Sequence, residues 1–468
     1  MTGEGVARPF SRRGKSPAMQ KPSRSRVSDI TFSARAQALH DLSAAELAGL
    51  VERSEADISS LDSYVRPLIA RVRDEGDAAV RALTAEFDKV DLGDLPLRAT
   101  PEEFDAAEAE LPASLLTSID RAIANIEKGH RDQLREPVIV TEISDGVTIG
   151  ERTLPLGSVG LYVPRGKGSF PSVVMMLAVP AVVAGVKRPV IVTPPGPGGR
   201  VDAATLAAAR RAGVTEVYRV GGVQAIAALA YGTESIPRAP KVLGPGNSYV
   251  TAAKRALAGV IDPGVPAGPS ESIVFADETV SADLAAHDLL IEAEHGPDSC
   301  AVLVTPSQAY AEDVARRLPD LVAALPAQRR DFIATNFAGR SRVLWTRSED
   351  EAIDFINLFA PEHLSLLSTD AERLLDRIEN AGEVMVGPHA PITLGNFCAG
   401  TNAILPTGGL ARSASCLGVP DFQKRSSFVK VNATGFAALA PTAIELADYE
   451  GFPAHAAAVR RRLADKPS

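Results

Sequence analysis

Apolar positions in the first third of the chain recur at helical spacing. Residues 66–88 (RPLIARVRDEGDAAVRALTAEFD) and 103–133 (EFDAAEAELPASLLTSIDRAIANIEKGHRDQ) carry apolar side chains three and four positions apart. In SAAELAGLVERS, Ser43 precedes the apolar positions and Glu46 follows three residues later, which is the spacing of a helix capping box. The pattern predicts helices across residues 35–135.

The pattern changes near residue 147, where short apolar runs alternate with helical stretches. SVGLYVP, PVIVTPP, EVYRVGG and KVLGPGN run into Gly or Pro, and segments such as RVDAATLAAARRAG and VQAIAALAYG separate them. SIVFAD, CAVLVT, RVLWT, LSLLS and EVMVG form a second set, and beyond residue 418 the pattern becomes helical again. Strands that alternate with helices predict parallel sheets covered by helices. We therefore expect an α/β protein with two units in tandem.

Composition narrows the class of function. The chain has 468 residues, and 49 basic against 58 acidic residues give a net charge of −9, so a broad basic surface for nucleic acid is absent. The longest apolar run, residues 172–186, is shorter than a membrane span and contains Pro180, so it predicts a buried helix beside a sheet. A small-molecule enzyme without nucleic-acid or membrane partners is the expectation.

The cysteines and the N-terminus bear on location. Cys300, Cys398 and Cys416 have no CxxC spacing and leave one unpaired in any disulfide scheme, which favours a reducing compartment and here predicts the cytoplasm. Residues 1–34 are rich in Arg, Lys, Ser and Pro and predict a disordered tail. Translation from Met19 and an organelle transit peptide are the alternatives for this stretch.

Three Gly-containing loops follow predicted strands of the first set. They are residues 162–172 (YVPRGKGSFPS), 220–225 (VGGVQA) and 244–250 (GPGNSYV). Ligands of α/β sheets bind at the carboxyl ends of strands, and a helix that starts there offers free N–H groups to a phosphate. None of the loops matches GxGxxG, so the usual dinucleotide motif is absent.

Two pairs of acidic and histidine residues are candidates for chemistry. Glu292 and His295 share one face near the end of a helix that we expect to run from about Ser281, which suits either half of a metal site or a solvated helix end. Glu362 and His363, in APEHLSLL, directly precede a strand. One of them could orient water while the other moves protons, or the pair could be a helix–strand corner.

Nine motifs occur together in one order. They are GLYVP, GGVQAIAALAYGTESIP, GPGNSYVTAAKR, AGPSE, AEHGPDS, APEHL, AGTNAILPT, DFQKR and AHAAAVRRR. With them the chain resembles the histidinol dehydrogenase family over about residues 35–465. The resemblance implies a zinc-dependent, NAD-linked enzyme that oxidises an amino alcohol through the aldehyde to the acid, as in the step from histidinol to histidine in amino-acid biosynthesis. It also implies a domain-swapped homodimer in which a C-terminal tail reaches the partner subunit.

The resemblance further implies a division of the chain into two Rossmann-like domains with a helical N-terminal region and a helical C-terminal tail. The expected parts are a tail at 1–34, a helical segment at 35–58, a first domain at 59–161 plus 272–417, a second domain with the NAD contacts at 162–271, and a helical dimerisation tail at 418–468.

Residue roles also follow from the resemblance, position by position. The implied NAD contacts are Tyr162, Gln224 and Asn247. The implied catalytic pair is Glu362 and His363. The implied ligands of one Zn²⁺ per subunit are Glu292, His295, Asn396 and His455, the last of them from the other subunit. The implied substrate contacts are Ser270 and Glu450, together with His363 and the four metal ligands. By its pattern alone, His455 on the last helix is a surface histidine.

Three positions depart from the family pattern. The usual metal set is Gln, His, Asp and His, whereas Glu292 and Asn396 stand at the Gln and Asp positions; the two exchanges cancel in charge and still offer two imidazoles and two oxygens. Ala403 stands where a substrate-contacting histidine is usual. Three readings stay open: a histidinol enzyme, a dehydrogenase for another small polar alcohol such as a sulfopropanediol, and a non-catalytic binding paralogue.

Overall fold

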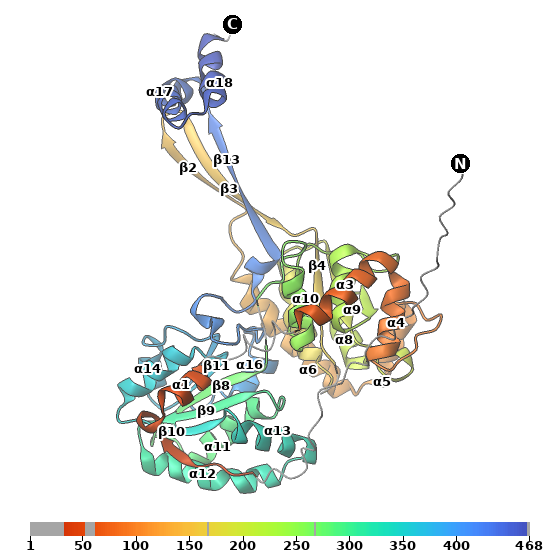
Figure 1. Cartoon of the computed structure of the whole chain (residues 1–468), viewed down its shortest axis with the longest axis vertical. Coiled ribbons are helices and arrows are strands. Elements are labelled where there is room, and N and C mark those ends of the chain that lie inside the picture. Colours follow the sequence, from red (N-terminus) through yellow and green to blue (C-terminus); the bar gives the residue numbers. More distant parts are fainter. Residues whose placement is uncertain (1–31, 52–60, 166–167, 266–267, 466–468) are drawn as a thin grey trace, which may run out of the picture.

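The computed structural model describes residues 32–51, 61–165, 168–265 and 268–465. A six-stranded parallel sheet organises the larger part of the body, in the strand order β1-β10-β9-β8-β11-β12 (Figure 1). Its strands are β1 (Ala36–Ala38), β8 (Glu271–Ala276), β9 (Cys300–Thr305), β10 (Arg342–Trp345), β11 (His363–Leu367) and β12 (Glu383–Val386). Strands β8, β9 and β11 are buried along their whole length, as continuous apolar runs covered on both faces should be.

Helices cover both faces of this sheet. They are α1 (Ala44–Val51), α11 (Ala282–Ala293), α12 (Gln308–Ala323), α13 (Ala327–Ala338), α14 (Glu349–Phe359), α15 (Ala371–Leu375) and α16 (Ile392–Phe397). One apolar cluster joins the sheet to α11, α12 and α13, and a second joins it to α1, α14 and α15. The expected capping box begins α1, where the Ser43 N–H donates to Glu46 Oε2 at 2.8 Å.

A four-stranded parallel sheet organises the second part of the body, in the order β6-β5-β4-β7. Its strands are β4 (Ser158–Tyr162), β5 (Arg188–Thr193), β6 (Val217–Arg219) and β7 (Val242–Leu243). The helices between and after them are α7 (Pro171–Val183), α8 (Ala203–Arg211), α9 (Gly222–Tyr231) and α10 (Ser248–Ala256). The expected α/β class with parallel sheets is thus confirmed.

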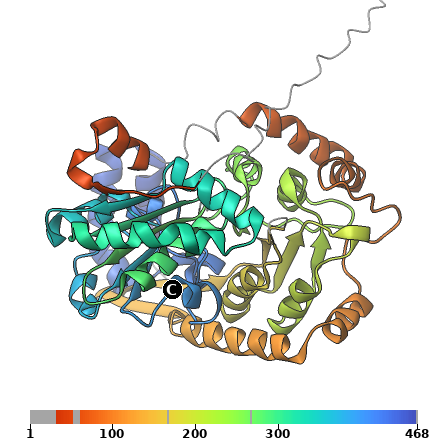
Figure 2. The same cartoon turned by 90° about the horizontal axis from the view of Figure 1, so that it is seen from below.

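The N-terminal helices pack on the four-stranded unit. They are α3 (Asp62–Glu75), α4 (Asp77–Phe87), α5 (Pro101–Glu110) and α6 (Ala113–Arg131). Helix α3 contacts α9 and α10, α5 contacts α8, and α6 contacts α7. Figure 2 shows these red-brown to orange helices around the yellow-green sheet. The first elements differ from the expected all-helical region, because β1 pairs with β10 in the larger sheet.

An arm leads away from the body (Figure 1). It begins with an antiparallel sheet in the order β13-β3-β2, formed by β2 (Val138–Ser144), β3 (Val147–Pro155) and β13 (Gln423–Val431). Helices α17 (Ala433–Tyr449) and α18 (Pro453–Ala464) complete it. The expectation of an entirely helical stretch beyond residue 418 is therefore wrong for β13. This strand forms because all nine of its residues pair with β3, about 270 positions earlier in the chain, and local periodicity carries no sign of that pairing.

Short 3-10 turns complete the described elements: η1 (Leu39–Asp41), η2 (Pro197–Gly199), η3 (Leu410–Arg412) and η4 (Val419–Phe422). The run at 172–186 forms α7, a buried helix as expected. Within the described ranges, no helix has the length and apolar character needed to cross a membrane. The expected tail at 1–34 lies almost entirely outside the described residues, which begin at Phe32.

Candidate active site

Several candidate catalytic residues lie at the amino edge of the six-stranded sheet, where its parallel strands begin. Glu271 opens β8, His363 opens β11 and Glu383 opens β12. Parallel register aligns them, since the Cα of His363 lies opposite that of Glu383 on one side and that of Ser272 on the other. The sequence places these residues far apart, and the sheet brings them into one row.

Helix α11 delivers the first predicted pair to this edge. Ser281 caps its start by accepting from the Leu284 N–H, and the helix ends at Ala293, so His295 lies just beyond the last turn. The Glu292 side chain is 1 % exposed, and its Oε2 lies 3.2 Å from His295 Nδ1. Ser270 Oγ lies 3.1 Å from the same nitrogen.

Asn396, on α16, completes a group of three predicted metal ligands. Its Nδ2 donates to Glu292 Oε1 at 2.8 Å, so the amide, the carboxylate and the His295 imidazole meet in one place. Oxygen and imidazole donors are a set that zinc accepts, and rotation of the amide would present its oxygen to the same space. The donor set of these three residues therefore fits the zinc ion that the family resemblance implies.

The fourth predicted metal ligand does not lie with these three residues. His455 lies on α18, in the arm, where its ring packs 5.2 Å from that of Phe452. Glu450 directly follows α17 in the same region, as its C-cap residue. Among the residues that the structure describes, no three His, Cys, Asp or Glu side chains form a metal-binding group. One chain thus brings together Glu292, His295 and Asn396, and leaves His455 apart.

Glu362 and His363 are delivered by a tight turn from α14. The turn is closed by Ala360 in the left-handed conformation, with φ of 51°, which is uncommon for a residue with a Cβ. Glu362 is buried and its Oε2 accepts from the Glu271 N–H at 2.8 Å. Burial raises the pKa of Glu362 to about 8, which favours the protonated acid near neutral pH.

His363 faces a carboxylate that the sequence analysis missed. Its Nδ1 lies 3.2 Å from Glu383 Oε2, and both side chains are buried. Burial lowers the pKa of His363, but the negative charges of Glu292, Glu383 and Glu362 outweigh it and raise the pKa to about 9. The only local sign of Glu383 was a charged residue at the start of an apolar strand.

The segment from Cys398 to Gly408 joins this edge to the four-stranded unit. The Gly408 N–H donates to Glu271 Oε2 at 3.0 Å, while Asn402 Nδ2 donates to the Met176 carbonyl on α7 at 2.8 Å. The N–H of Ala403 lies 3.3 Å from Met176 Sδ. Ala403 is half-buried beside α7, so the missing imidazole leaves only a methyl group at this junction.

The three glycine loops, apart from residues 166–167, lie at the carboxyl edge of the four-stranded sheet. Tyr162 ends β4, and its Oη accepts from the Gly222 N–H at 3.2 Å. Gln224, in the first turn of α9, donates through Nε2 to Asp88 Oδ2 at 3.4 Å, and its buried Oε1 has no partner within the described residues. An unpaired buried acceptor and two helix starts fit a dinucleotide.

The third loop positions Asn247. Asn247 is exposed and caps α10, where its Oδ1 accepts from the N–H groups of Tyr249 and Val250 at 3.1 Å each. Gly244, earlier in the loop, has φ of 113°, and a Cβ there would lie 2.2 Å from the Tyr162 carbonyl oxygen. The backbone of this loop therefore passes close to the end of β4 only because residue 244 is glycine.

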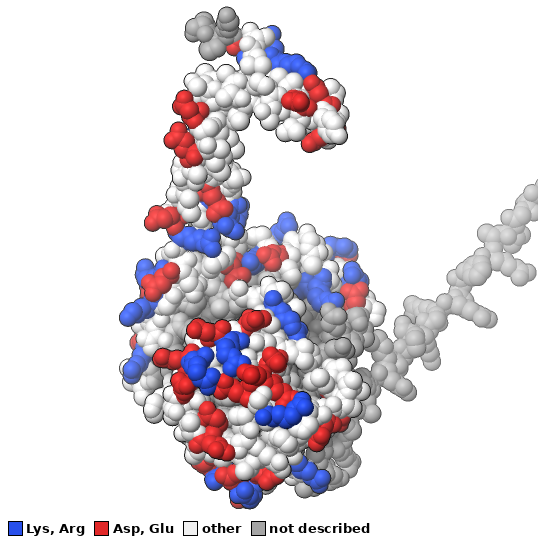
Figure 3. Space-filling model, turned by 90° about the vertical axis from the view of Figure 1, so that its left-hand side faces the viewer, with Lys and Arg blue, Asp and Glu red and all other residues white. Residues whose placement is uncertain are grey.

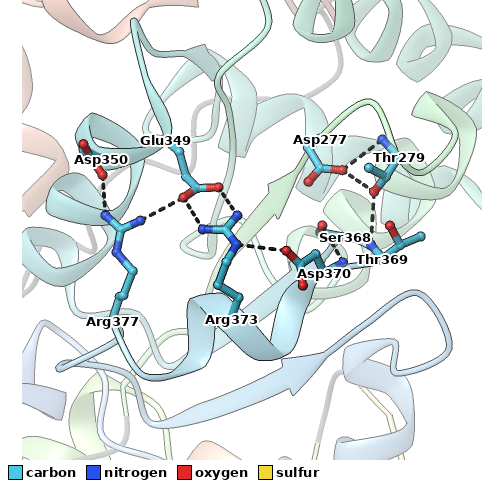
Figure 4. A network of polar contacts seen from close by, with 9 residues as sticks. All are labelled: Asp277, Thr279, Glu349, Asp350, Ser368, Thr369, Asp370, Arg373 and Arg377. Atoms are coloured by element: carbon cyan, nitrogen blue, oxygen red, sulfur yellow. Dashed lines mark hydrogen bonds and ion pairs between the residues drawn. The ribbon is translucent and has the colours of Figure 1, made fainter.

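A network of ion pairs and hydrogen bonds lies at the carboxyl edge of the six-stranded sheet (Figure 4). Arg373 donates to both oxygens of Glu349 at 2.7 and 2.6 Å, and Arg377 bonds Glu349 and Asp350. Asp277, just after β8, bonds Thr279. Ion pairs and hydrogen bonds therefore engage these side chains with one another, in contrast to the buried residues of the amino edge.

Comparison with known proteins accords with this geometry. The family model described as histidinol dehydrogenase matches residues 51–463. This chain belongs to the histidinol dehydrogenase family. A protein of Cereibacter sphaeroides named "Histidinol dehydrogenase homolog" is 52% identical over 425 residues, covering 90% of this chain and 96% of that protein. A "Histidinol dehydrogenase" of Synechocystis sp. is 47% identical over 424 residues, covering 91% and 98%.

A solved relative supports the fold. The crystal structure of histidinol dehydrogenase from Elizabethkingia anophelis superposes with a TM-score of 0.85 at 34% identity, covering 92% of this chain and 98% of that chain. The predicted family membership is thus confirmed, and the chain is an oxidoreductase of an NAD-linked dehydrogenase family with a role in amino-acid biosynthesis. Both "homolog" and unqualified names occur among the relatives, so the family does not fix the alcohol.

Proposed function

We propose that this chain oxidises a small polar alcohol through the aldehyde to the acid, with two NAD reduced for each alcohol. The observation that carries the proposal is the buried Glu362–His363 pair beside the Glu292–His295–Asn396 group, close enough for the Glu292 charge to act on both Glu362 and His363. Histidinol is the first candidate substrate. Another small polar alcohol, such as a sulfopropanediol, is the second, and Ala403 beside Met176 favours it because the usual imidazole is absent there.

The reaction has two halves, and a different side chain of the amino edge acts as the base in each. In the first half His363 takes the hydroxyl proton of the alcohol while hydride leaves the carbon that bears the hydroxyl group and passes to NAD. In the second half the ionised form of Glu362, which its raised pKa makes a stronger base, accepts a proton from water as that water attacks the aldehyde, and the resulting hydrate gives its hydride to a second NAD. Zinc, when bound, would polarise the alcohol oxygen and offset the charge of Glu292 that raises the pKa of His363.

We propose that NAD is held by the carboxyl edge of the four-stranded sheet. Tyr162 and Gln224 lie there under the glycine loops, and Asn247 fixes the start of α10. The two parallel sheets would form the cores of two Rossmann-like domains. The contacts of α3 to α6 with α7 to α10 support assigning residues 62–131 to the domain of residues 162–271 rather than to that of residues 272–417.

We also propose that each metal site is completed by the partner subunit in a domain-swapped homodimer. His455 and Glu450 lie on the arm, and Figure 3 shows that much of the arm surface is uncharged. The arm exposes many large apolar side chains, including Val138, Ile139, Val140, Ile143, Val429, Val431, Leu446, Tyr449 and Phe452. Apolar surface of this kind marks an interaction face, which a second copy of the chain would cover.

The proposed activity is tested by NADH absorbance with a panel of alcohols. We expect NADH with histidinol or with a sulfopropanediol, in a ratio of two per alcohol consumed, and about one zinc per subunit by elemental analysis of the same preparation. His295→Ala should remove the metal and the activity, whereas His389→Ala, on a nearby loop, should keep both. Full activity in a metal-free preparation would overturn the metal site, and no NADH with any alcohol would favour a binding protein.

A further inference from the structure

Glu383 is the one carboxylate in hydrogen-bond contact with His363 within the described part of the chain. It opens β12, and its Cα lies directly opposite that of His363 in the parallel register. Residues paired in this way point to the same face of a sheet. The carboxylate therefore lies beside the imidazole because of strand pairing, and its Oε2 is 3.2 Å from Nδ1.

The surroundings of Glu383 are shaped around its carboxylate. The side chain is 6 % exposed, and Oε1 has no partner among the described residues. A Cβ at Gly395 would lie 2.7 Å from Oε2 and 2.9 Å from Oε1, so glycine at that position makes room for both oxygens. A buried carboxylate is unfavourable unless a partner compensates it, and His363 is the partner that the structure provides.

We propose that Glu383 is a positioning residue for His363, a role that rests on the proposed function of His363 as a base. By accepting the hydrogen of Nδ1, Glu383 fixes the tautomer in which Nε2 carries the lone pair. Nε2 can then take the alcohol proton, and the carboxylate stabilises the imidazolium that results. The proton leaves later to solvent, and Glu383 itself neither gains nor loses one.

Glu362 does not share this role. Its Oε2 is engaged by the Glu271 N–H, and Glu271 in turn accepts from Gly408. Glu292 is engaged by Asn396 and lies beside His295. The neighbouring carboxylates therefore have other partners, and Glu383 alone has the geometry that orients the His363 ring.

The test compares Glu383→Gln, Glu383→Leu and Glu383→Asp in the full-length protein. Nitrogen NMR of ¹⁵N-histidine-labelled protein without substrate, recorded at about pH 10 where the His363 ring is neutral, reports which ring nitrogen carries hydrogen, with His363→Asn identifying its signals. We expect Nδ1–H in the wild type and loss of that tautomer in Glu383→Leu and Glu383→Gln. Loss of tautomer control should lower kcat by about 10²- to 10⁴-fold with less than about threefold change in KM. Glu383→Asp should restore part of both readouts.

Glu379→Leu is the matched control, because it changes an exposed glutamate on the loop that leads to β12. It should leave the NMR signals and kcat unchanged. If Glu383→Leu fails to fold, the near-isosteric Glu383→Gln decides. An unchanged His363 tautomer and kcat in Glu383→Gln would overturn the positioning role. A tautomer change in a protein that reduces no NAD would uphold the positioning and reject the proposed function, so the two failures are distinguishable.

Discussion

The carboxyl edge of the four-stranded sheet and the amino edge of the six-stranded sheet present different kinds of chemical groups. The first presents glycine loops, helix starts and the amide of Gln224. The second presents buried ionisable side chains, among them Glu292, Glu362, His363 and Glu383. Under the proposed function, the rule that α/β sheets bind ligands at their carboxyl edge applies to the smaller sheet and not to the larger one.

The difference follows from what each edge has to hold. A dinucleotide needs backbone N–H groups and room for close approach, which glycine loops provide. Proton transfer needs side chains with fixed orientation and shifted pKa, which packing in a strand row provides. At the carboxyl edge of the larger sheet, Arg373 and Arg377 form ion pairs with Glu349 instead. Substitutions should therefore act on chemistry at one edge and on cofactor affinity at the other.

The largest effect is expected at the amino edge. His363→Asn removes the base, and kcat should fall by about 10³-fold, while the dissociation constant for NAD changes less than about twofold. Steady-state kinetics and calorimetric titration with NAD measure the two quantities. A parallel loss of NAD affinity would contradict the separation of the two edges.

A second test asks whether the amino edge is complete within one chain. His295→Ala and His455→Ala proteins should each be inactive, and mixing them should restore some activity, because a hybrid dimer contains one site with both histidines. Mass spectrometry of differently labelled subunits confirms exchange. Confirmed exchange without recovery would mean that each chain completes its own site or that His455 has no part in it.

Gly244→Ala tests the carboxyl edge. A methyl group 2.2 Å from the Tyr162 carbonyl forces the loop to move, so NAD affinity should fall by more than about tenfold and the free energy of unfolding by about 2 kcal/mol. Gly259→Ala is the control, since Gly259 also has a positive φ of 99° but no atom within 4 Å of its added Cβ. It should cost about 1 kcal/mol and leave NAD affinity unchanged. Equal losses of NAD affinity in both would reject the role of the loop.

Some features of these two edges could be predicted from the sequence, and others could not. The glycine loops and the Glu292–His295 spacing are local features, so a short stretch of chain reveals them. Glu383 is 20 positions from His363 in the chain, and only the register of β11 and β12 makes them neighbours. The pairing of β13 with β3 was hidden for the same reason. The place of His455 stays a prediction, because it depends on a second chain.

Ala403→His probes the junction between the two units. A restored imidazole beside Met176 could hydrogen-bond the alcohol oxygen of histidinol, but would crowd the space that Ala403 now shares with Met176. For a repurposed enzyme, kcat/KM on histidinol should rise by about tenfold, the value of one hydrogen bond, while turnover of the native alcohol falls. Wild-type kcat/KM on histidinol above about 10⁴ M⁻¹s⁻¹ would instead favour histidinol as the substrate.

The smallest effect is expected at Asp88, a carboxyl group with a raised pKa beside the glycine loops. Burial raises the pKa of Asp88 to about 6, although Arg165 acts in the opposite direction. A folded-state pKa above the unfolded value means that the folded protein binds the proton more tightly, so Asp88 destabilises the fold above about pH 6 and this penalty disappears as the pH falls toward about 4.

Asp88→Asn removes that penalty and keeps an acceptor for the Gln224 amide. The free energy of unfolding should therefore rise by about 1 kcal/mol at pH 7, a value discounted for the partial exposure of the carboxyl group, and by almost nothing near pH 4. Urea melts of both proteins across this range measure the difference. NAD affinity should change less than about threefold, because the asparagine oxygen can still accept from the Gln224 amide. A gain that persists at pH 4 would show that the carboxyl group is not its source, and a large loss of NAD affinity would make Asp88 part of the cofactor site.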